Sequence, residues 1–129
     1  MTNVKFFKCN HCGNVLTPAF DAGVPPFCCG EKMQLLEVGV TDAALEKHVP
    51  VVEKDADGRH VVIKVGAVEH PMTDEHYIQF IVLAQGSKTQ LVKLTPADKP
   101  EAKFSVKDNT QPLTAYEFCN LHGLWKTEA

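Results

Sequence analysis

Four cysteines fall within the first 29 residues of this 129-residue chain: Cys9 and Cys12, then the adjacent pair Cys28 and Cys29. A Cys-x2-Cys knuckle places two sulfurs on one side of a tight turn, and a second pair completes a tetrahedral set of four. This donor set suits zinc or a single iron, and the spacing does not decide between them. Because adjacent ligands cannot both adopt relaxed knuckle geometry, we expect a distorted site.

A second group of potential metal ligands is spread over the rest of the chain. It comprises four histidines and the fifth cysteine: His48, His70, His76, Cys119 and His122. Each is predicted to lie at a strand end or in a loop. Four imidazoles and one thiolate would leave one position open, whereas structural zinc sites are four-coordinate and closed. The ligand count therefore favours a redox metal that binds a further molecule.

Other interpretations of these residues remain open. Disulfides would require an oxidising compartment, which nothing in the sequence supports. A zinc ribbon joined to a β-sandwich without a redox role would give the histidines no purpose. A blue-copper electron carrier would need an axial methionine late in the chain, but no methionine follows Met72. His11 and His60 are interpreted as ordinary histidines without a metal role.

The composition is that of an ordinary globular protein, with 44% hydrophobic and 22% charged residues. A formal net charge of −3 argues against a nucleic-acid partner. No apolar run approaches the roughly 20 residues that a membrane span needs, and the first residues lack the apolar segment of a signal peptide. We expect a cytoplasmic protein with no membrane association.

The elements that must position the two ligand sets divide into two parts. Residues 1–37 are rich in turns and too few to fold without a metal or another cross-link. In the second part, residues 38–129, we expect a short helical turn over 43–48, capped by Thr41 or Asp42.

From residue 51 onwards, six or seven short strands alternate with turn sequences such as 55–58. The longest of them, residues 76–85, is apolar enough to be central. The predicted fold is therefore mainly β, a small metal module followed by an antiparallel β-sandwich.

At the level of motifs, the chain resembles the desulfoferrodoxins, the two-iron class of superoxide reductase. The segments that carry the resemblance occur in order: CNHCGN, FCCGEKM, EKHVP, HPM with EH, and CNLHG. The resemblance implies a desulforedoxin-like module at 1–37, with a rubredoxin-like iron held by Cys9, Cys12, Cys28 and Cys29. It implies an immunoglobulin-like catalytic sandwich at 38–129. There, a second iron is held by an equatorial plane of His48, His70, His76 and His122 and by Cys119 as axial thiolate.

The resemblance also implies an activity, the one-electron reduction of superoxide to hydrogen peroxide without oxygen evolution. A rubredoxin-like protein would donate the electron, and the chain would form a homodimer. Glu46 matches the carboxylate that closes the sixth position in the oxidised state, and Lys47 matches the lysine beside the open face. Glu117 is a candidate to tune the Cys119 sulfur, or else a solvated strand residue. A pure electron carrier is the alternative function.

Overall fold

The computed structural model describes residues 3–39 and 45–129, so the expected helix cap at Thr41 or Asp42 lies outside the described residues. The chain divides into two compact units, Asn3–Glu37 and Val38–Ala129, and each is described by itself. Within the described residues, the structure contains a single helix, of four residues, and none that could span a membrane.

The N-terminal unit is built from five strands of two residues each. They are β1 (Phe7–Lys8), β2 (Val15–Leu16), β3 (Phe27–Cys28), β4 (Glu31–Lys32) and β5 (Gln34–Leu35). Strand β1 pairs with β2 and β5, and β3 pairs with β4, all antiparallel. A buried cluster of Phe7, Cys9 and Met33 lies between them. So small a core indicates that the unit depends on its cysteines for stability.

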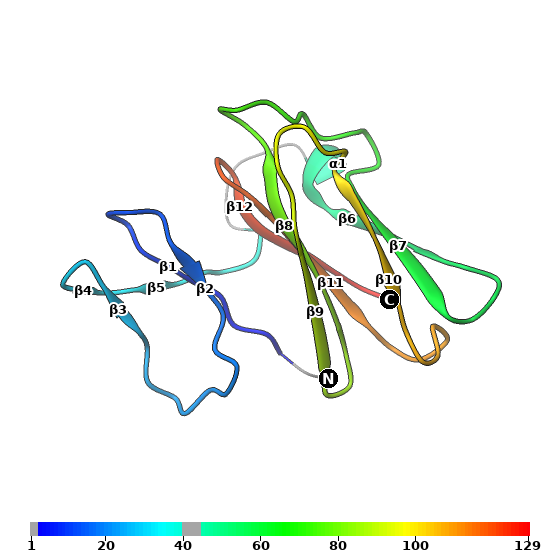
Figure 1. Ribbon diagram of the computed structural model, residues 1–129, viewed down its shortest axis with the longest axis horizontal. Coiled ribbons are helices and arrows are strands. Elements are labelled where there is room, and N and C mark those ends of the chain that lie inside the picture. Colours follow the sequence, from blue (N-terminus) through cyan, green and yellow to red (C-terminus); the bar gives the residue numbers. More distant parts are fainter. Residues whose placement is uncertain (1–2, 40–44) are drawn as a thin grey trace. The chain divides into compact units, whose positions relative to one another are not determined.

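The second unit is an antiparallel β-sandwich, as predicted (Figure 1). Its elements are α1 (Leu45–His48), β6 (Pro50–Lys54), β7 (His60–Val65), β8 (Ile78–Gln85), β9 (Lys88–Lys93), β10 (Glu101–Ser105), β11 (Thr114–Cys119) and β12 (Gly123–Glu128). One sheet has the order β10-β7-β6 and the other the order β12-β11-β8-β9. The longest predicted strand is confirmed as central, because β8 lies between β11 and β9.

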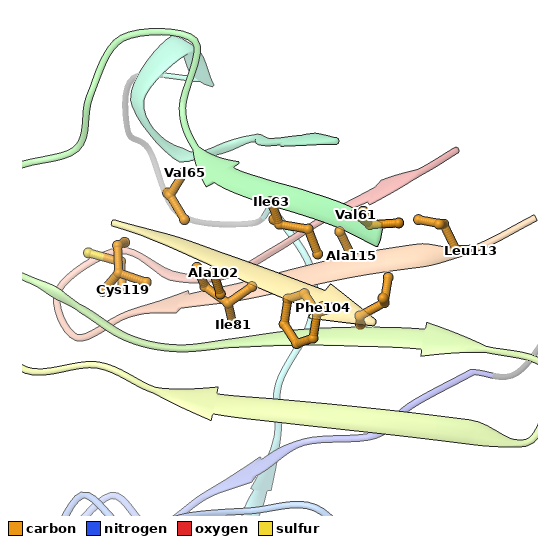
Figure 2. Packing of buried hydrophobic residues seen from close by; sticks show 11 residues of the cluster. Val61, Ile63, Val65, Ile81, Ala102, Phe104, Leu113, Ala115 and Cys119 are labelled. Atoms are coloured by element: carbon orange, nitrogen blue, oxygen red, sulfur yellow. The ribbon is translucent and has the colours of Figure 1, made fainter. Parts of the chain in front are cut away.

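The interior of the sandwich is filled by apolar residues from the facing sheets (Figure 2). Strand β7 contributes every second residue, Val61, Ile63 and Val65, all of them fully or almost fully buried, which is the alternation expected of a half-buried strand. Cys119 lies at the end of this core near Val65 and is itself completely buried. One predicted ligand is therefore also a core residue.

A β-bulge adjusts the sheet beside Cys119. Phe118 pairs with Phe80, but Cys119 pairs with Ile78, so Gln79 is an extra residue on β8. The bulge turns apolar Ile78, rather than polar Gln79, into the core next to the thiol. Bulges of this kind redirect side chains close to functional sites.

Three connecting segments meet at one end of the sandwich: α1, the loop between β7 and β8, and the turn between β11 and β12 (Figure 1). The loop packs tightly on α1 at Gly66, where φ is +85°. A Cβ atom there would lie 2.7 Å from Lys47 Cα and 2.4 Å from Val68 O. The Val68 N–H also donates to Glu46 O, at 3.0 Å. Only glycine fits this contact without displacing α1.

Gly66→Ala should therefore destabilise the protein by about 2–4 kcal/mol, combining left-handed strain with a backbone clash. The matched control is Gly58→Ala, because Gly58 has φ +75° but no atom within 4 Å of a Cβ. It should cost only the strain, about 1 kcal/mol. Urea denaturation of both variants measures the difference, and equal losses would contradict the packing argument.

Candidate metal centres

The four early cysteines come together within the N-terminal unit. Their ligand atoms all lie within 4.8 Å of one another. The sulfurs of Cys12 and Cys28 are 3.6 Å apart, and those of Cys28 and Cys29 are 3.9 Å apart. Both distances are far longer than a disulfide bond, and all five cysteines are free. They match the separation of about 3.8 Å that tetrahedral ligands have at a metal–sulfur distance of about 2.3 Å.

The pKa values of these thiols indicate that a cation is needed to stabilise four thiolates together. Backbone N–H groups of Cys12 and His11 hold the pKa of Cys9 at about 6, which favours a thiolate there. The neighbouring sulfurs of Cys12 and Cys9 in turn raise the pKa of Cys29 to about 12. Four thiolates cannot share this space unless a metal ion compensates their charge.

The backbone of the adjacent cysteine pair is strained. Cys29 adopts φ +54°, in the left-handed region that residues with a side chain rarely occupy. His11, inside the knuckle, does not join the sulfurs, since its Nε2 lies 3.0 Å from Glu31 Oε2. Its interpretation as a histidine without a metal role agrees with this placement.

The second ligand set comes together from four segments of the sandwich unit. His48 ends α1, His70 and His76 lie in the loop between β7 and β8, Cys119 ends β11, and His122 lies in the next turn. The ligand atoms of His48, His76, Cys119 and His122 lie within 4.8 Å of one another. His70 approaches the same point, with its Nε2 3.2 Å from His48 Nε2. The structure thus gathers all five residues.

The four imidazoles are arranged as a square. Neighbouring ring centroids are 4.7 Å apart for His48 and His70, 4.6 Å for His70 and His76, 5.0 Å for His76 and His122, and 4.8 Å for His122 and His48. Each neighbouring pair is nearly perpendicular, at 78° to 90°. His48 and His76, at opposite corners, are 6.4 Å apart and nearly parallel, at 24°. These separations are compatible with four ligands in one plane.

Hydrogen bonds alone do not account for the inward-facing nitrogens. His48 Nε2 lies 3.2 Å from His70 Nε2 and 3.1 Å from His122 Nδ1. His70 Nδ1 donates to Pro71 O at 2.7 Å, which leaves a lone pair on its Nε2. His76 Nε2 is buried and has no hydrogen-bond partner among the residues that the structure describes. Ligands at right angles and about 2.1 Å from a metal would be separated by about 3 Å, so the residues fit a metal ion.

The protonation of the histidines suits ligation. Burial lowers the pKa of His70 to about 4, and burial together with the charge of His122 lowers the pKa of His76. Both imidazoles are therefore neutral near pH 7 and offer lone pairs. Burial raises the pKa of the Cys119 thiol, although backbone N–H groups of Leu121 and His122 oppose that effect. A metal would displace the thiol proton on binding.

The position of Glu117 contradicts one of the two interpretations of this residue. Its side chain is fully buried, so the prediction of a solvated strand residue is wrong. Neither carboxyl oxygen has a hydrogen-bond partner among the described residues, and burial raises its pKa well above the ordinary value. A charge on Glu117 would also raise the pKa of Cys119. Glu117 is thus close enough to influence the sulfur.

Glu46 and Lys47 lie on the exposed turn of α1 directly before His48. The positive charge of Lys47 contributes to lowering the pKa of His76, so it reaches the histidine group. The structure fixes Glu46 through its backbone carbonyl, which accepts the Val68 N–H. Its carboxylate is exposed at the same end of the sandwich.

Two residues that support the ligands were not identified from the sequence. Trp125 Nε1 donates to His122 O at 3.0 Å, and its ring lies 5.3 Å from the His48 ring. The Asn120 side chain donates a hydrogen bond to Glu75 O and accepts one from the Tyr77 N–H, on either side of His76. The position of Asn120 between Cys119 and His122 was the one available signal, because residues beside ligands often orient other ligands.

Comparison with known proteins agrees with these donor sets. The family model described as Desulfoferrodoxin matches residues 40–128. A desulfoferrodoxin of Syntrophotalea carbinolica is 46% identical over 125 residues, covering 97% of this chain and 96% of the relative.

Solved structures show the same likeness. The crystal structure of the superoxide reductase from Treponema pallidum has a TM-score of 0.78 and 38% identity, covering 98% of this chain and 99% of that one. The superoxide reductase (1Fe-SOR) from Giardia intestinalis has a TM-score of 0.55 and 35% identity, covering 65% of this chain and 97% of its own. The four-cysteine and the four-histidine, one-cysteine groups are consistent with the two iron centres of desulfoferrodoxins. The chain belongs to the desulfoferrodoxin family.

Proposed function

We propose that this chain is a superoxide reductase that converts superoxide, one electron and two protons into hydrogen peroxide, without evolving oxygen. The observation that carries the proposal is the square of four imidazoles close to a buried cysteine. Relatives that cover most of the chain support it, since the Treponema pallidum protein is described as a superoxide reductase.

The burial of the ligands indicates where a substrate would enter. Cys119 is completely buried in the core, whereas His76 and His122 are partly exposed. The side of the site away from the sulfur is therefore the one that solvent and a small anion can reach. Bound ferrous iron would supply the single electron, and thiolate ligation tunes how readily it does so.

Lys47 would attract and hold the anionic substrate. It is an exposed cation whose field already reaches His76. The chain as a whole has a formal charge of −3 and would repel superoxide, so a local positive charge at the entrance matters for the encounter rate. Glu46, on the same turn, would close the site to other ligands after peroxide leaves.

We assign further properties from the same family resemblance. Residues 1–37 would form the Fe(Cys)4 module, and residues 38–129 the catalytic domain. A rubredoxin-like protein would supply electrons, and two chains would form a homodimer in the cytoplasm. The exposed side chains of Cys12 and Cys29 support the proposal of an electron-donor protein, because an iron held there would lie near the surface, where such a protein can approach.

The products distinguish this function from its alternatives. The reduced protein should yield one hydrogen peroxide per superoxide consumed, with no oxygen. Half a peroxide and half an oxygen per superoxide would indicate dismutation and contradict the proposal. If the protein does not consume superoxide stoichiometrically, the result would favour a pure electron carrier.

Lys47→Ala should lower the second-order rate constant with superoxide by about threefold to tenfold at low salt, and the loss should shrink as ionic strength rises. Lys88→Ala is the matched control, because it removes the same charge from β9, a strand that carries no ligand. Stopped-flow or pulse-radiolysis kinetics across ionic strengths measure both. Equal effects of the two variants would contradict a local role for Lys47.

Cys119→Ser should abolish the sulfur-to-iron absorption band of the histidine site. It should also reduce the rate with superoxide by more than about 100-fold, because loss of a ligand exceeds the 10–100-fold effect typical of outer-shell changes. Ala115→Ser, which adds a hydroxyl on the same strand at another buried position, controls for polarity in the core. Retention of the band in Cys119→Ser would remove Cys119 from the ligand set.

Cys12→Ser should remove the iron of the N-terminal unit while the spectrum of the histidine site persists, since the two units are separately compact. Elemental analysis and visible spectroscopy of the purified variant test this outcome. Loss of both metals would show that the sandwich depends on the N-terminal unit.

A further inference from the structure

His76 occupies a loop position that its own segment does not orient. It lies two residues before β8, which begins at Ile78. The loop is closed locally, because the Thr73 N–H donates to His76 O at 2.9 Å and the His76 N–H donates to Thr73 O at 3.2 Å. These bonds set the shape of the turn, but they cannot fix it relative to β11, where Cys119 lies.

Asn120 makes the connection to the other strand. Its Nδ2 donates to Glu75 O at 3.0 Å, and its Oδ1 accepts the Tyr77 N–H at 2.9 Å. The Asn120 backbone N–H also donates to Tyr77 O, at 3.2 Å. One residue therefore holds the peptide groups on both sides of His76.

The chemistry of asparagine explains why this residue can act as such a clamp. A carboxamide offers a donor and an acceptor on one planar group, as a peptide group does. Its orientation is fixed by its partners, because a carbonyl can only accept and an N–H can only donate. The side chain thereby extends the β11–β8 pairing beyond Cys119 and Ile78, where the bulge ends the regular register.

We propose that Asn120 is a positioning residue that sets His76 in the square relative to Cys119 and His122. The inference rests on the proposed ligand set, because it matters to a metal only if His76 is a ligand. Asn120 directly follows Cys119 and precedes His122 by two residues, so a single clamp ties the loop ligand to both ligands of the turn. Outer-shell partners of this kind orient ligands and tune the metal.

The chain contains a matched control in Asn109. Its Nδ2 donates to Asp55 O at 2.7 Å and to His60 O at 2.9 Å, so it too clamps a loop by two side-chain hydrogen bonds to backbone. Asn109 belongs to the connection between β10 and β11, and this connection runs at the end of the sandwich opposite the β11–β12 turn (Figure 1). Asn109→Ala removes an equivalent clamp far from every proposed ligand.

The experiment compares Asn120→Ala and Asn109→Ala in the iron-loaded protein. Loss of ferrous iron from the histidine site to a chelator should be at least about tenfold faster in Asn120→Ala, and the midpoint potential of that site should shift. Asn109→Ala should lose stability in urea but keep the iron-loss rate and the potential of the unmodified protein. The same iron-loss rate and potential in Asn120→Ala and the unmodified protein would overturn the proposal.

Asn120→Asp keeps the size and the acceptor for Tyr77, and serves if the alanine variant fails to fold. It loses the donor to Glu75 O, so it should release iron faster than the unmodified protein, and an unchanged rate would overturn the inference. His76→Ala separates this test from the proposed function. If His76→Ala keeps its iron, the ligand set itself is wrong. If it loses the iron while Asn120→Ala and Asn120→Asp behave normally, only the clamp is wrong.

Discussion

The convergence of five donor atoms on one point is the constraint on which the sandwich unit depends. Three imidazole nitrogens lie 3.1–3.2 Å apart close to a buried thiol, and the hydrogen bonds in the part of the chain that the structure describes leave His76 Nε2 without a partner. Burial keeps His70 and His76 neutral, so their lone pairs are available rather than protonated. A cation at the centre would accept the lone pairs of these nitrogens and of the thiolate at once.

The β-sandwich supplies this arrangement by combining a rigid base with short connections. Cys119 belongs to the packed core, and the bulge at Gln79 places Ile78 beside it. The histidines come from α1, a loop and a turn that meet at one end of the two sheets (Figure 1). Each connection is tied down by its own contact: Gly66 against α1, and Asn120 across His76.

Much of this organisation could be predicted from the sequence, and there are physical reasons why the remaining features could not. Strand alternation in residues 60–65 and the spacing in CNLHG are local signals: the first predicted β7 correctly, and the second predicted the pair Cys119 and His122, which the structure brings close to His48 and His76. Glu117 was ambiguous, because a charged residue on a strand is usually solvated, and only the sheet pairing reveals its burial. The clamps made by Asn120 and Trp125 join segments far apart in sequence, so no local pattern reports them.

The central claim is that both donor sets bind iron. Elemental analysis of iron and zinc in the purified, untagged protein tests it most directly. The account predicts about two irons per chain and negligible zinc, because four imidazoles and a thiolate favour a redox metal and the four-cysteine set is consistent with the second iron centre of the desulfoferrodoxins. One zinc and no iron, with no second metal after anaerobic loading with ferrous salt, would leave only the cysteine module and contradict the account.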